Sequence, residues 1–336
     1  MSDVMRPRVA LVLGDPAGIG PELVAKLLSD STIRNYASTL IIGDEDEMLE
    51  GMRIAGCDFP YRVVADPEAI AEGADTPFLC DFRGGAKPPF EYRKATANGG
   101  RYVLDTLSLA LSLTHQGVTE ALCFAPLNKT AMHMAGMPQN DELAWFAFKL
   151  GHEGPYGELN SLEGLWTSRV TSHVALKDVS GLLTPEKVAT AAELIYLALI
   201  DAGVTSPRIA VCGLNPHNGD NGAFGREEID VIEPGIRIAN ARGVPASGPF
   251  PPDTVFIKAK DKELDAVVTM YHDQGQIAMK LMGFSSGVSL GGGLPIPITT
   301  PTHGTAFDIY GKGSANPGAM IRAFRLACDI GLRRRG

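Results

Sequence analysis

Short apolar runs rich in β-branched residues alternate with longer segments of helical periodicity along the whole chain. This alternation is typical of α/β folds, in which a helix connects each strand to the next parallel strand. We therefore predict an α/β fold with a central, mostly parallel sheet. The predicted strands are Val9–Leu13, Leu40–Ile42, Tyr61–Val64, Ala121–Phe124, Val170–His173, Ile209–Leu214, Ala266–Tyr271 and Val288–Leu290, and the predicted helices include Gly20–Leu28, Tyr102–His115, Pro185–Asp201 and Glu227–Ala241.

Loops rich in glycine and proline follow several of these strands, at residues 14–21, 215–225 and 283–301. Because ligands of open α/β sheets bind at the carboxyl ends of the strands, we expect the site in these loops. The chain is long enough for two domains. A weak boundary near residues 115–130 predicts a first α/β domain of residues 1–125 plus 300–336 and a second of residues 126–299.

The net charge of −9 and the isoelectric point near 5.3 argue against nucleic-acid binding, which needs a basic surface. The five cysteines are odd in number and form no CxxC pair, and Cys123 and Cys212 lie in apolar runs. This pattern favours reduced core thiols and a cytoplasmic protein. No apolar run approaches the roughly 20 residues needed to span a bilayer, so we expect no membrane association.

Three histidines each follow an apolar strand: His173 in TSHVALKD, His217 in NPHNGDNG and His272 in MYHDQG. A single histidine is more often a surface residue or a satisfied core residue than a metal ligand. Three in equivalent positions at strand ends make a metal site about as probable as that ordinary role. Neutral imidazoles bind Zn²⁺, Mn²⁺, Co²⁺ or Ni²⁺, and three protein ligands leave a coordination position open for substrate.

Two charged residues near these histidines have alternative interpretations. Asp253 could orient an imidazole, or it could cap a helix or stabilise a turn. Lys280 follows His272 by eight residues. Its ammonium could transfer a proton or bind a carboxylate, or the side chain could simply extend from a helix into solvent.

Two glycine-rich segments are candidate ligand loops. The first, LVLGDPAGIGPEL, joins a strand to a helix but lacks the GxGxxG spacing of a dinucleotide fingerprint. The second, THGTAFDIYGKGSANPGA, leads into a helix, and backbone of this kind can receive an adenosine or phosphate group. A plain loop with helix caps would have a similar composition.

The ordered blocks GDPAGIGPE, SHVALKDV, GLNPHNGDNGAFGREE, GPFPPDT, MYHDQG, GLP and HGTAFDIYGKGSANPGA closely resemble the 4-hydroxythreonine-4-phosphate dehydrogenase family of vitamin B6 biosynthesis. Its first and last blocks also resemble isocitrate and isopropylmalate dehydrogenases, whose fold the family shares. The resemblance implies an αβα two-domain architecture and a homodimer with shared active sites. The first domain would lie on the cofactor side, and the second would carry the metal, the substrate and the dimer interface.

The same resemblance implies roles for individual residues. His173, His217 and His272 would be the ligands of a divalent metal (Zn, Mn, Co, Ni or Mg), contributed from both subunits. Lys280 would contact the substrate and, with Asp253, would serve catalysis. The cofactor, NAD or alternatively NADP, would be bound by Gly293, His303, Gly304, Thr305, Ala306, Asp308 and Asn316.

The chain also departs from the family pattern. In an ungapped count, the family's His-Thr pair at the substrate phosphate falls on Glu142 and Leu143, its substrate-binding arginine on Ile298 and its asparagine on Ser289. An anion needs donors and positive charge, and a carboxylate beside a phosphate repels it by roughly 1 kcal/mol. These departures, and the serine and paired glycines of the late loop, resemble the terephthalate cis-dihydrodiol dehydrogenase subgroup.

The expected function is therefore metal-dependent, NAD(P)-linked oxidation of a secondary alcohol beside a carboxylated carbon, followed by decarboxylation. The expected substrate is a non-phosphorylated carboxylate such as terephthalate 1,2-cis-dihydrodiol, giving the catechol protocatechuate. One alternative is a 4-hydroxythreonine-4-phosphate dehydrogenase of pyridoxal phosphate biosynthesis or a related sugar-acid phosphate dehydrogenase. Another is a catalytically silent relative that binds a metabolite as a sensor.

Overall fold

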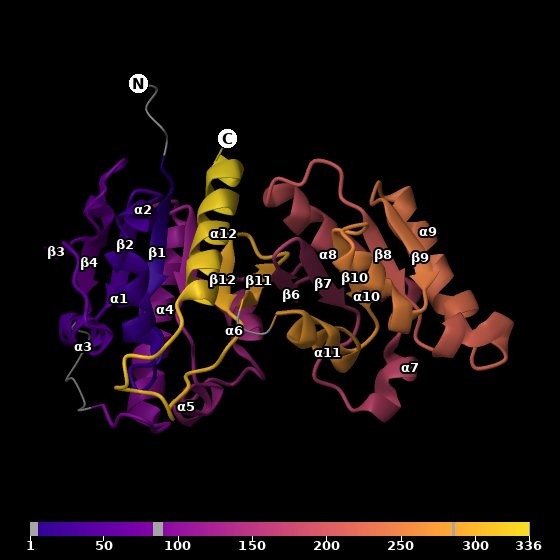
Figure 1. The fold of residues 1–336 in the computed structure, drawn as a ribbon, viewed down its shortest axis with the longest axis horizontal. Helices are drawn as coiled ribbons and strands as arrows, with labels where there is room; N and C mark the ends of the chain where they lie inside the picture. Colours follow the sequence, from indigo (N-terminus) through magenta and orange to yellow (C-terminus); the bar gives the residue numbers. More distant parts are fainter. Residues whose placement is uncertain (1–5, 83–89, 284–285, 336) are drawn as a thin grey trace. The chain divides into compact units, whose positions relative to one another are not determined.

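The computed structural model describes residues 6–82, 90–283 and 286–335 (Figure 1). The chain forms two compact units, one of residues 1–153 and 294–336 and one of residues 154–293. The predicted domain boundaries were near residues 125 and 300. The first boundary lies later in the chain, because α5 (Lys129–Met134) and α6 (Glu142–Lys149) bury Met132, Trp145 and Phe146 in the core of the first unit.

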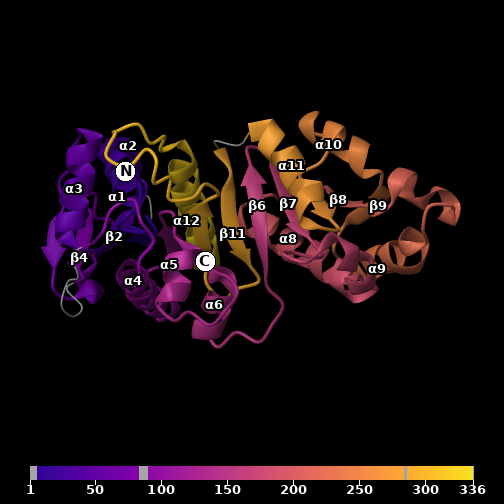
Figure 2. The same cartoon turned by 90° about the horizontal axis from the view of Figure 1, so that it is seen from below.

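The strands of the first unit are all parallel, in the order β3-β4-β2-β1-β5-β12. Its strands are β1 (Arg8–Val12), β2 (Ser38–Gly43), β3 (Arg62–Val64), β4 (Phe78–Asp81), β5 (Ala121–Phe124) and β12 (Ile298–Pro301). Its other helices are α1 (Gly20–Ser29), α2 (Ser31–Arg34), α3 (Glu45–Ala55), the short η1 (Pro67–Ala69), α4 (Ala97–His115) and α12 (Gly318–Arg335). Figure 2 shows α4 and α12 on opposite faces of this sheet. Residues 9–12 of β1 are completely buried, as expected for a strand covered on both faces.

The strands of the second unit follow the order β11-β6-β7-β10-β8-β9. The pairs β11–β6 and β6–β7 are antiparallel, and the remaining pairs are parallel. Its strands are β6 (Gly157–Leu162), β7 (Leu165–Arg169), β8 (Ile209–Cys212), β9 (Ala246–Phe250), β10 (Ala266–Thr269) and β11 (Val288–Gly292). Its helices are η2 (Leu176–Asp178), α7 (Val179–Leu182), α8 (Pro185–Asp201), η3 (Pro216–Gly222), η4 (Glu228–Ile232), α9 (Glu233–Ala241), α10 (Pro252–Lys260) and α11 (His272–Gly283). The predicted α/β class with mostly parallel strands is confirmed.

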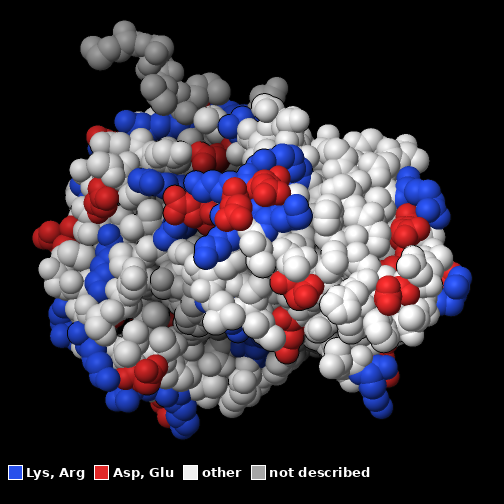
Figure 3. Space-filling model, turned by 45° about the vertical axis from the view of Figure 1, so that its right-hand side comes forward, with Lys and Arg blue, Asp and Glu red and all other residues white. Residues whose placement is uncertain are grey.

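The structure also describes the cysteines, the apolarity of the helices and the distribution of surface charge. Cys123 and Cys212 are buried and free, and burial raises the pKa of each thiol to about 12. Among the described residues, no helix is long and apolar enough to cross a membrane. On the face drawn in Figure 3, acidic and basic side chains are interleaved rather than separated into patches. Ion pairs such as Arg208–Asp265, at 2.8 Å, are of this mixed kind.

Candidate functional site

Two of the predicted metal ligands lie close together in the second unit. His173 follows β7, and His272 begins α11 directly after β10; their ring centroids are 5.7 Å apart. Because β7 and β10 are parallel neighbours, their carboxyl ends bring both histidines to one edge of the sheet. His173 is exposed and has a φ of 48°, in the left-handed region that residues other than glycine rarely adopt.

A neighbouring carboxylate orients the second of these imidazoles. Nδ1 of His272 lies 2.7 Å from Oδ1 of Asp273. Metal-binding histidines often donate one ring N–H to a carboxylate, which fixes the tautomer and leaves the other nitrogen for the metal. With Nδ1 donating to Asp273, Nε2 of His272 keeps its lone pair for a ligand role.

His217 belongs to a different part of the second unit. Residues 217–221 of η3 all have φ between 43° and 76°. The His217 side chain lines a cavity of about 620 Å³ together with Asp253 and Tyr271. Within residues 6–82, 90–283 and 286–335, no group of three or more His, Cys, Asp or Glu side chains could hold a metal ion. A pair of imidazoles fits part of a metal site, but the described part of one chain does not present three ligands.

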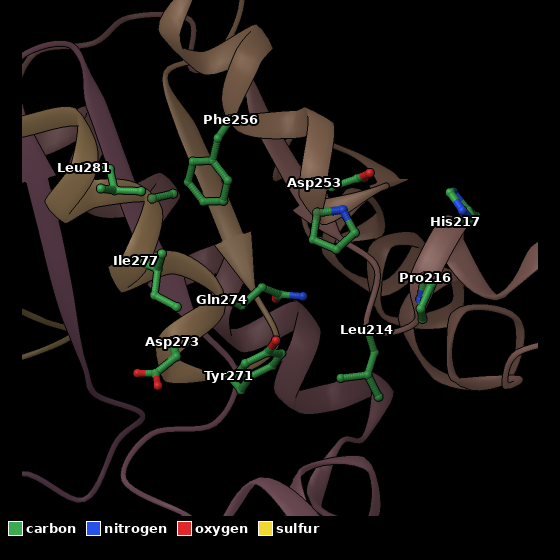
Figure 4. Close-up of a pocket in the computed structure, with 12 residues that line it drawn as sticks. Leu214, Pro216, His217, Asp253, Phe256, Tyr271, Asp273, Gln274, Ile277 and Leu281 are labelled. Atoms are coloured by element: carbon green, nitrogen blue, oxygen red, sulfur yellow. The ribbon is translucent and has the colours of Figure 1, made fainter.

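The cavity has apolar walls and a few polar groups, as ligand pockets commonly do. Figure 4 shows Asp253 near His217 and Asp273 toward the opposite end, with Phe256 and Ile277 from α10 and α11 along the wall. Asp253 is exposed in the first turn of α10. Lys280 is exposed on α11, the helix that His272 begins. Both residues predicted to serve catalysis therefore belong to the same unit as the histidines.

The residues predicted to bind substrate are dispersed. Ile298 is 2% exposed in the core of the first unit, so it does not face a substrate, and Leu143 packs partly buried against the same core. Glu142 pairs with Lys129 at 2.9 Å. Ser289, on β11, donates to Oε1 of Glu158 at 2.9 Å. The ungapped count therefore assigned the role of a family arginine to a core isoleucine.

Two distant glycine-rich segments pack together in the first unit, where the cofactor was predicted. Ile19 N donates to Thr305 O at 3.1 Å, and a Cβ on Gly18 would lie 2.8 Å from Thr305 Cβ. Nδ1 of His303 is 3.2 Å from Gly304 O, and its buried Nε2 has no partner within the part of the chain that the structure describes. That nitrogen is a candidate acceptor for a ligand N–H.

The remaining predicted cofactor residues have varied positions. Asp308 is exposed, and Ala306 has a φ of 45°. Asn316 forms a turn just before α12, in which its Oδ1 accepts from Gly318 N at 2.9 Å. Gly293 belongs to the second unit, at a φ of 82°, where a Cβ would lie 2.2 Å from Pro155 O. Backbone geometry alone therefore requires glycine at position 293.

A partly buried ion pair that was not predicted from the sequence anchors this loop. Nζ of Lys26 lies 2.7 Å from Oε1 of Glu22 and donates to the carbonyls of Gly313 and Ala315 at 2.8 Å each. Oε1 of Glu22 also accepts from Ala315 N at 2.9 Å. The i,i+4 spacing of Glu22 and Lys26 on a helix could have suggested the pair, but not its contact with residues 313–315.

Asp15, in the first glycine-rich segment, is an almost completely buried carboxyl group. It is 1% exposed; Oδ1 accepts from Ala17 N at 2.9 Å, and Oδ2 has no partner among the described residues. Burial raises the pKa of Asp15 from its usual 3.8 to about 6, against the lowering effect of the Ala17 hydrogen bond. Folding therefore favours the protonated form.

This pKa predicts a pH-dependent effect of Asp15→Asn. A raised carboxyl pKa contributes stability that is fully present below about pH 3.8 and is lost as the pH rises through about 6. Asparagine does not titrate and loses no stability in this way. The free energy of unfolding of the variant, relative to that of the wild type, should therefore rise by up to about 3 kcal/mol between pH 4 and pH 8. Urea unfolding at both pH values measures this. A constant difference between the two proteins would contradict the assignment.

The profile of the family described as "Pyridoxal phosphate biosynthetic protein PdxA" matches residues 35–327. The chain belongs to this family. A Pseudomonas aeruginosa protein, provisionally named 4-hydroxythreonine-4-phosphate dehydrogenase 2, is 58% identical over 327 residues and covers 97% of each chain. The D-threonate 4-phosphate dehydrogenase of Pectobacterium atrosepticum is 36% identical, covering 96% of this chain and 98% of its own.

Solved structures support the same placement for this member of the PdxA family. A crystal structure of 4-hydroxythreonine-4-phosphate dehydrogenase from Klebsiella pneumoniae superposes with a TM-score of 0.86 at 32% identity, covering 98% of this chain and 99% of that one. Fold, profile and relatives agree that this chain is a dehydrogenase of the PdxA family.

The expectation of a dihydrodiol carboxylate dehydrogenase is wrong. The terephthalate 1,2-cis-dihydrodiol dehydrogenase structure from Burkholderia xenovorans has a TM-score of 0.68 at 28% identity, covering 96% of this chain and 98% of that one. The more similar relatives, at 58% and 36% identity, are named as dehydrogenases of phosphorylated substrates. The family match and these relatives do not support decarboxylation or a role in aromatic catabolism. Glu142 is paired with Lys129, which counters the carboxylate charge expected to repel a phosphate, and Ile298 lies in the core of the first unit.

Proposed function

We propose that this protein oxidises a hydroxyl group of a phosphorylated hydroxy acid, either 4-hydroxythreonine 4-phosphate or D-threonate 4-phosphate, with NAD⁺ or NADP⁺ as acceptor and a divalent metal. The names of its relatives support the substrate class. The observation that carries the proposal is the pair of imidazoles 5.7 Å apart at the carboxyl ends of β7 and β10. Neutral imidazoles suit a metal that retains a position for substrate oxygen, and the residues on either side of His272, Tyr271 and Asp273, line the cavity.

The side chains of the second unit would divide the chemistry among them. His173, His217 and His272 would hold the metal, which when bound supplies a Lewis acid that lowers the pKa of the substrate hydroxyl. Lys280 would orient the anionic substrate or move its hydroxyl proton, with Asp253 as its partner. The apolar cavity wall, including Phe256, would exclude water from the transferring hydride.

The loop of residues 303–316 in the first unit would receive the adenosine end of the cofactor. Two observations support this. The buried Nε2 of His303 is an unpaired acceptor among the described residues, and the contact between Gly18 and Thr305 brings backbone from two segments together. That contact packs the start of the loop against the first glycine-rich segment and leaves no room for a larger side chain at Gly18.

A panel of substrates tests the proposed activity. The purified protein, Mn²⁺ or Zn²⁺ and NAD⁺ are mixed with each of the two phosphorylated acids or with its dephosphorylated form, and NADH absorbance is followed. Charge-assisted hydrogen bonds contribute roughly 1.5–3 kcal/mol each, so kcat/KM should be about 100-fold higher for a phosphorylated substrate. Equal turnover of both forms, or no turnover of either phosphorylated acid, would refute the proposal.

We also propose that the active protein is a homodimer in which each metal site is completed by a second copy. One chain presents no three-ligand group within its described residues. Helices α10 and α11 expose three apolar side chains, Ile257 at 60%, Ile277 at 60% and Leu281 at 84%, of which Ile277 and Leu281 also line the cavity. Adjacent exposed apolar side chains of this kind mark interfaces, and a symmetric dimer is the commonest assembly.

This interface predicts that Leu281→Glu yields a monomer, because a buried carboxylate without a partner opposes association. Light scattering after size-exclusion chromatography measures the mass, and we expect a dimer for the wild type and a monomer for the variant. Leu197→Glu is the matched control, since Leu197 on α8 is 50% exposed and lies outside the proposed surface. A dimeric Leu281→Glu protein would place the interface elsewhere.

A further inference from the structure

A polar cluster lies on one face of the antiparallel part of the second unit. Ser289 on β11 is directly opposite Asn160 on β6, and Asn160 is opposite Thr167 on β7. Side chains two residues apart on a strand share a face, so Glu158 and Arg169 lie on that face too. Five polar side chains, Glu158, Asn160, Thr167, Arg169 and Ser289, therefore lie on one face of neighbouring strands.

Arg169 connects the strands of this cluster to the loop that carries His173. Its NH1 donates to Oδ1 of Asn160 at 2.9 Å, and its NH2 is paired with Glu158. Its Nε donates to Oγ of Ser172 at 2.8 Å. The Arg169 side chain is only 6% exposed, so its bonds fix the guanidinium within the protein.

Asn160 connects the same cluster to the helix that carries His272. Its Oδ1 accepts a second hydrogen bond, of 2.5 Å, from Nε2 of Gln276, which lies one turn after His272 on α11. A continuous path of hydrogen bonds therefore runs from Ser172 through Arg169 and Asn160 to Gln276. The path begins one residue before one histidine and ends one turn after the other.

This polar cluster is not expected to stabilise the fold more than an apolar strand face would. Burying polar and charged groups is unfavourable unless their hydrogen bonds are satisfied, and apolar residues of similar size are often at least as stable. At the same edge, His173 has a φ of 48°. Such strain persists only where the surroundings fix the backbone, and it is common at functional sites.

We propose that Arg169 and Asn160 are positioning residues that hold His173 and α11 in the geometry needed for metal binding. This inference rests on the proposed function, since it takes the histidines to be metal ligands. Partners outside the ligand set commonly change metal affinity 10–100-fold when they are removed. Arg169 and Asn160 act through Ser172 and Gln276 and need not touch substrate.

The test is a Co²⁺ titration of metal-free protein, followed by the visible absorption of the bound ion. Arg169→Met should weaken Co²⁺ binding about 10–100-fold and alter the spectrum, because the His173 loop loses its anchor. Arg169→Lys should restore part of the affinity, since lysine keeps the charge but not the fork of donors. Gln276→Met removes only the bond to α11, so it gives a milder loss in a folded protein.

Arg226→Met is the matched control. Arg226 pairs with Asp230 at 2.9 Å on the surface of the same unit, with its side chain 62% exposed, and its removal should leave Co²⁺ affinity unchanged. Wild-type affinity in folded Arg169→Met and Gln276→Met proteins would overturn the proposal, and a raised substrate KM alone would instead assign Arg169 to substrate binding. A wild-type protein that binds no Co²⁺ would refute the metal site itself, which separates the failure of the proposed function from the failure of this inference.

Discussion

Replacing His173 or His272 with alanine should lower kcat/KM by about 10³-fold, because each change removes a ligand from an ion expected to stabilise the developing alkoxide by several kcal/mol. Metal content, measured by mass spectrometry on dialysed protein, should fall in parallel. His173 is exposed and His272 half-buried, so neither change empties a core position, and the thermal midpoint should move little. NAD⁺ affinity should be retained, since the cofactor loop belongs to the other unit.

His115→Ala is the control for these variants. His115 ends α4 in the first unit and is exposed, so its loss should change neither turnover nor metal content. Normal turnover by His173→Ala or His272→Ala protein, measured after treatment with a chelator and reconstitution with Mn²⁺, would show that these imidazoles do not hold the catalytic ion.

The second large effect concerns stability and the cofactor loop. Lys26→Met should lower the free energy of unfolding by about 3–5 kcal/mol, because it leaves the Glu22 carboxylate, 2% exposed, without its cation. The carbonyls of Gly313 and Ala315 lose the same ammonium donor. Urea unfolding gives the stability, and fluorescence titration should show a raised Kd for NAD⁺.

Lys94→Met provides the matched comparison. Lys94 pairs with Glu91 at 2.8 Å, but both side chains are 63% exposed, so its removal should change stability far less than the Lys26 substitution does. If Lys26→Met were no more destabilising than Lys94→Met, the Glu22–Lys26 pair would not anchor the loop. An unchanged Kd for NAD⁺ in a destabilised Lys26→Met protein would place the cofactor away from residues 313–315.

Much of the fold could be predicted because β1, β5, β8 and β10 are continuous apolar runs buried on both faces. The hairpin of β6 and β7 was missed or displaced because it carries the polar cluster. Glu158, Asn160 and Arg169 replace the apolar residues that alternation requires, so the predicted strand began at Val170, where β7 has already ended. Local pattern fails where a strand carries polar side chains for another purpose.

Part of the candidate site could also be predicted from the sequence, because it depends on where strands end. Histidines at strand ends can be placed by topology, so the closeness of His173 and His272 could be expected without coordinates, while their role as ligands stays a prediction. Arg169 could not be found, because its role depends on Asn160 across the hairpin and on Gln276, more than 100 residues away. The burial of Ile298 could not be seen from its sequence position, because it depends on how β12 packs in the core of the first unit.

The proposed sharing of the metal site can be measured with mixed dimers. Each pair of the variants His173→Ala, His217→Ala and His272→Ala is co-expressed with different tags, and the heterodimers are purified. If two ligands come from one chain and the third from its partner, two of the three mixtures regain one intact site, or about half of wild-type activity per heterodimer. The one mixture without activity then identifies the two histidines that come from the same chain. Activity in none of the three mixtures would show that the histidines do not meet between subunits, and would contradict the proposed centre.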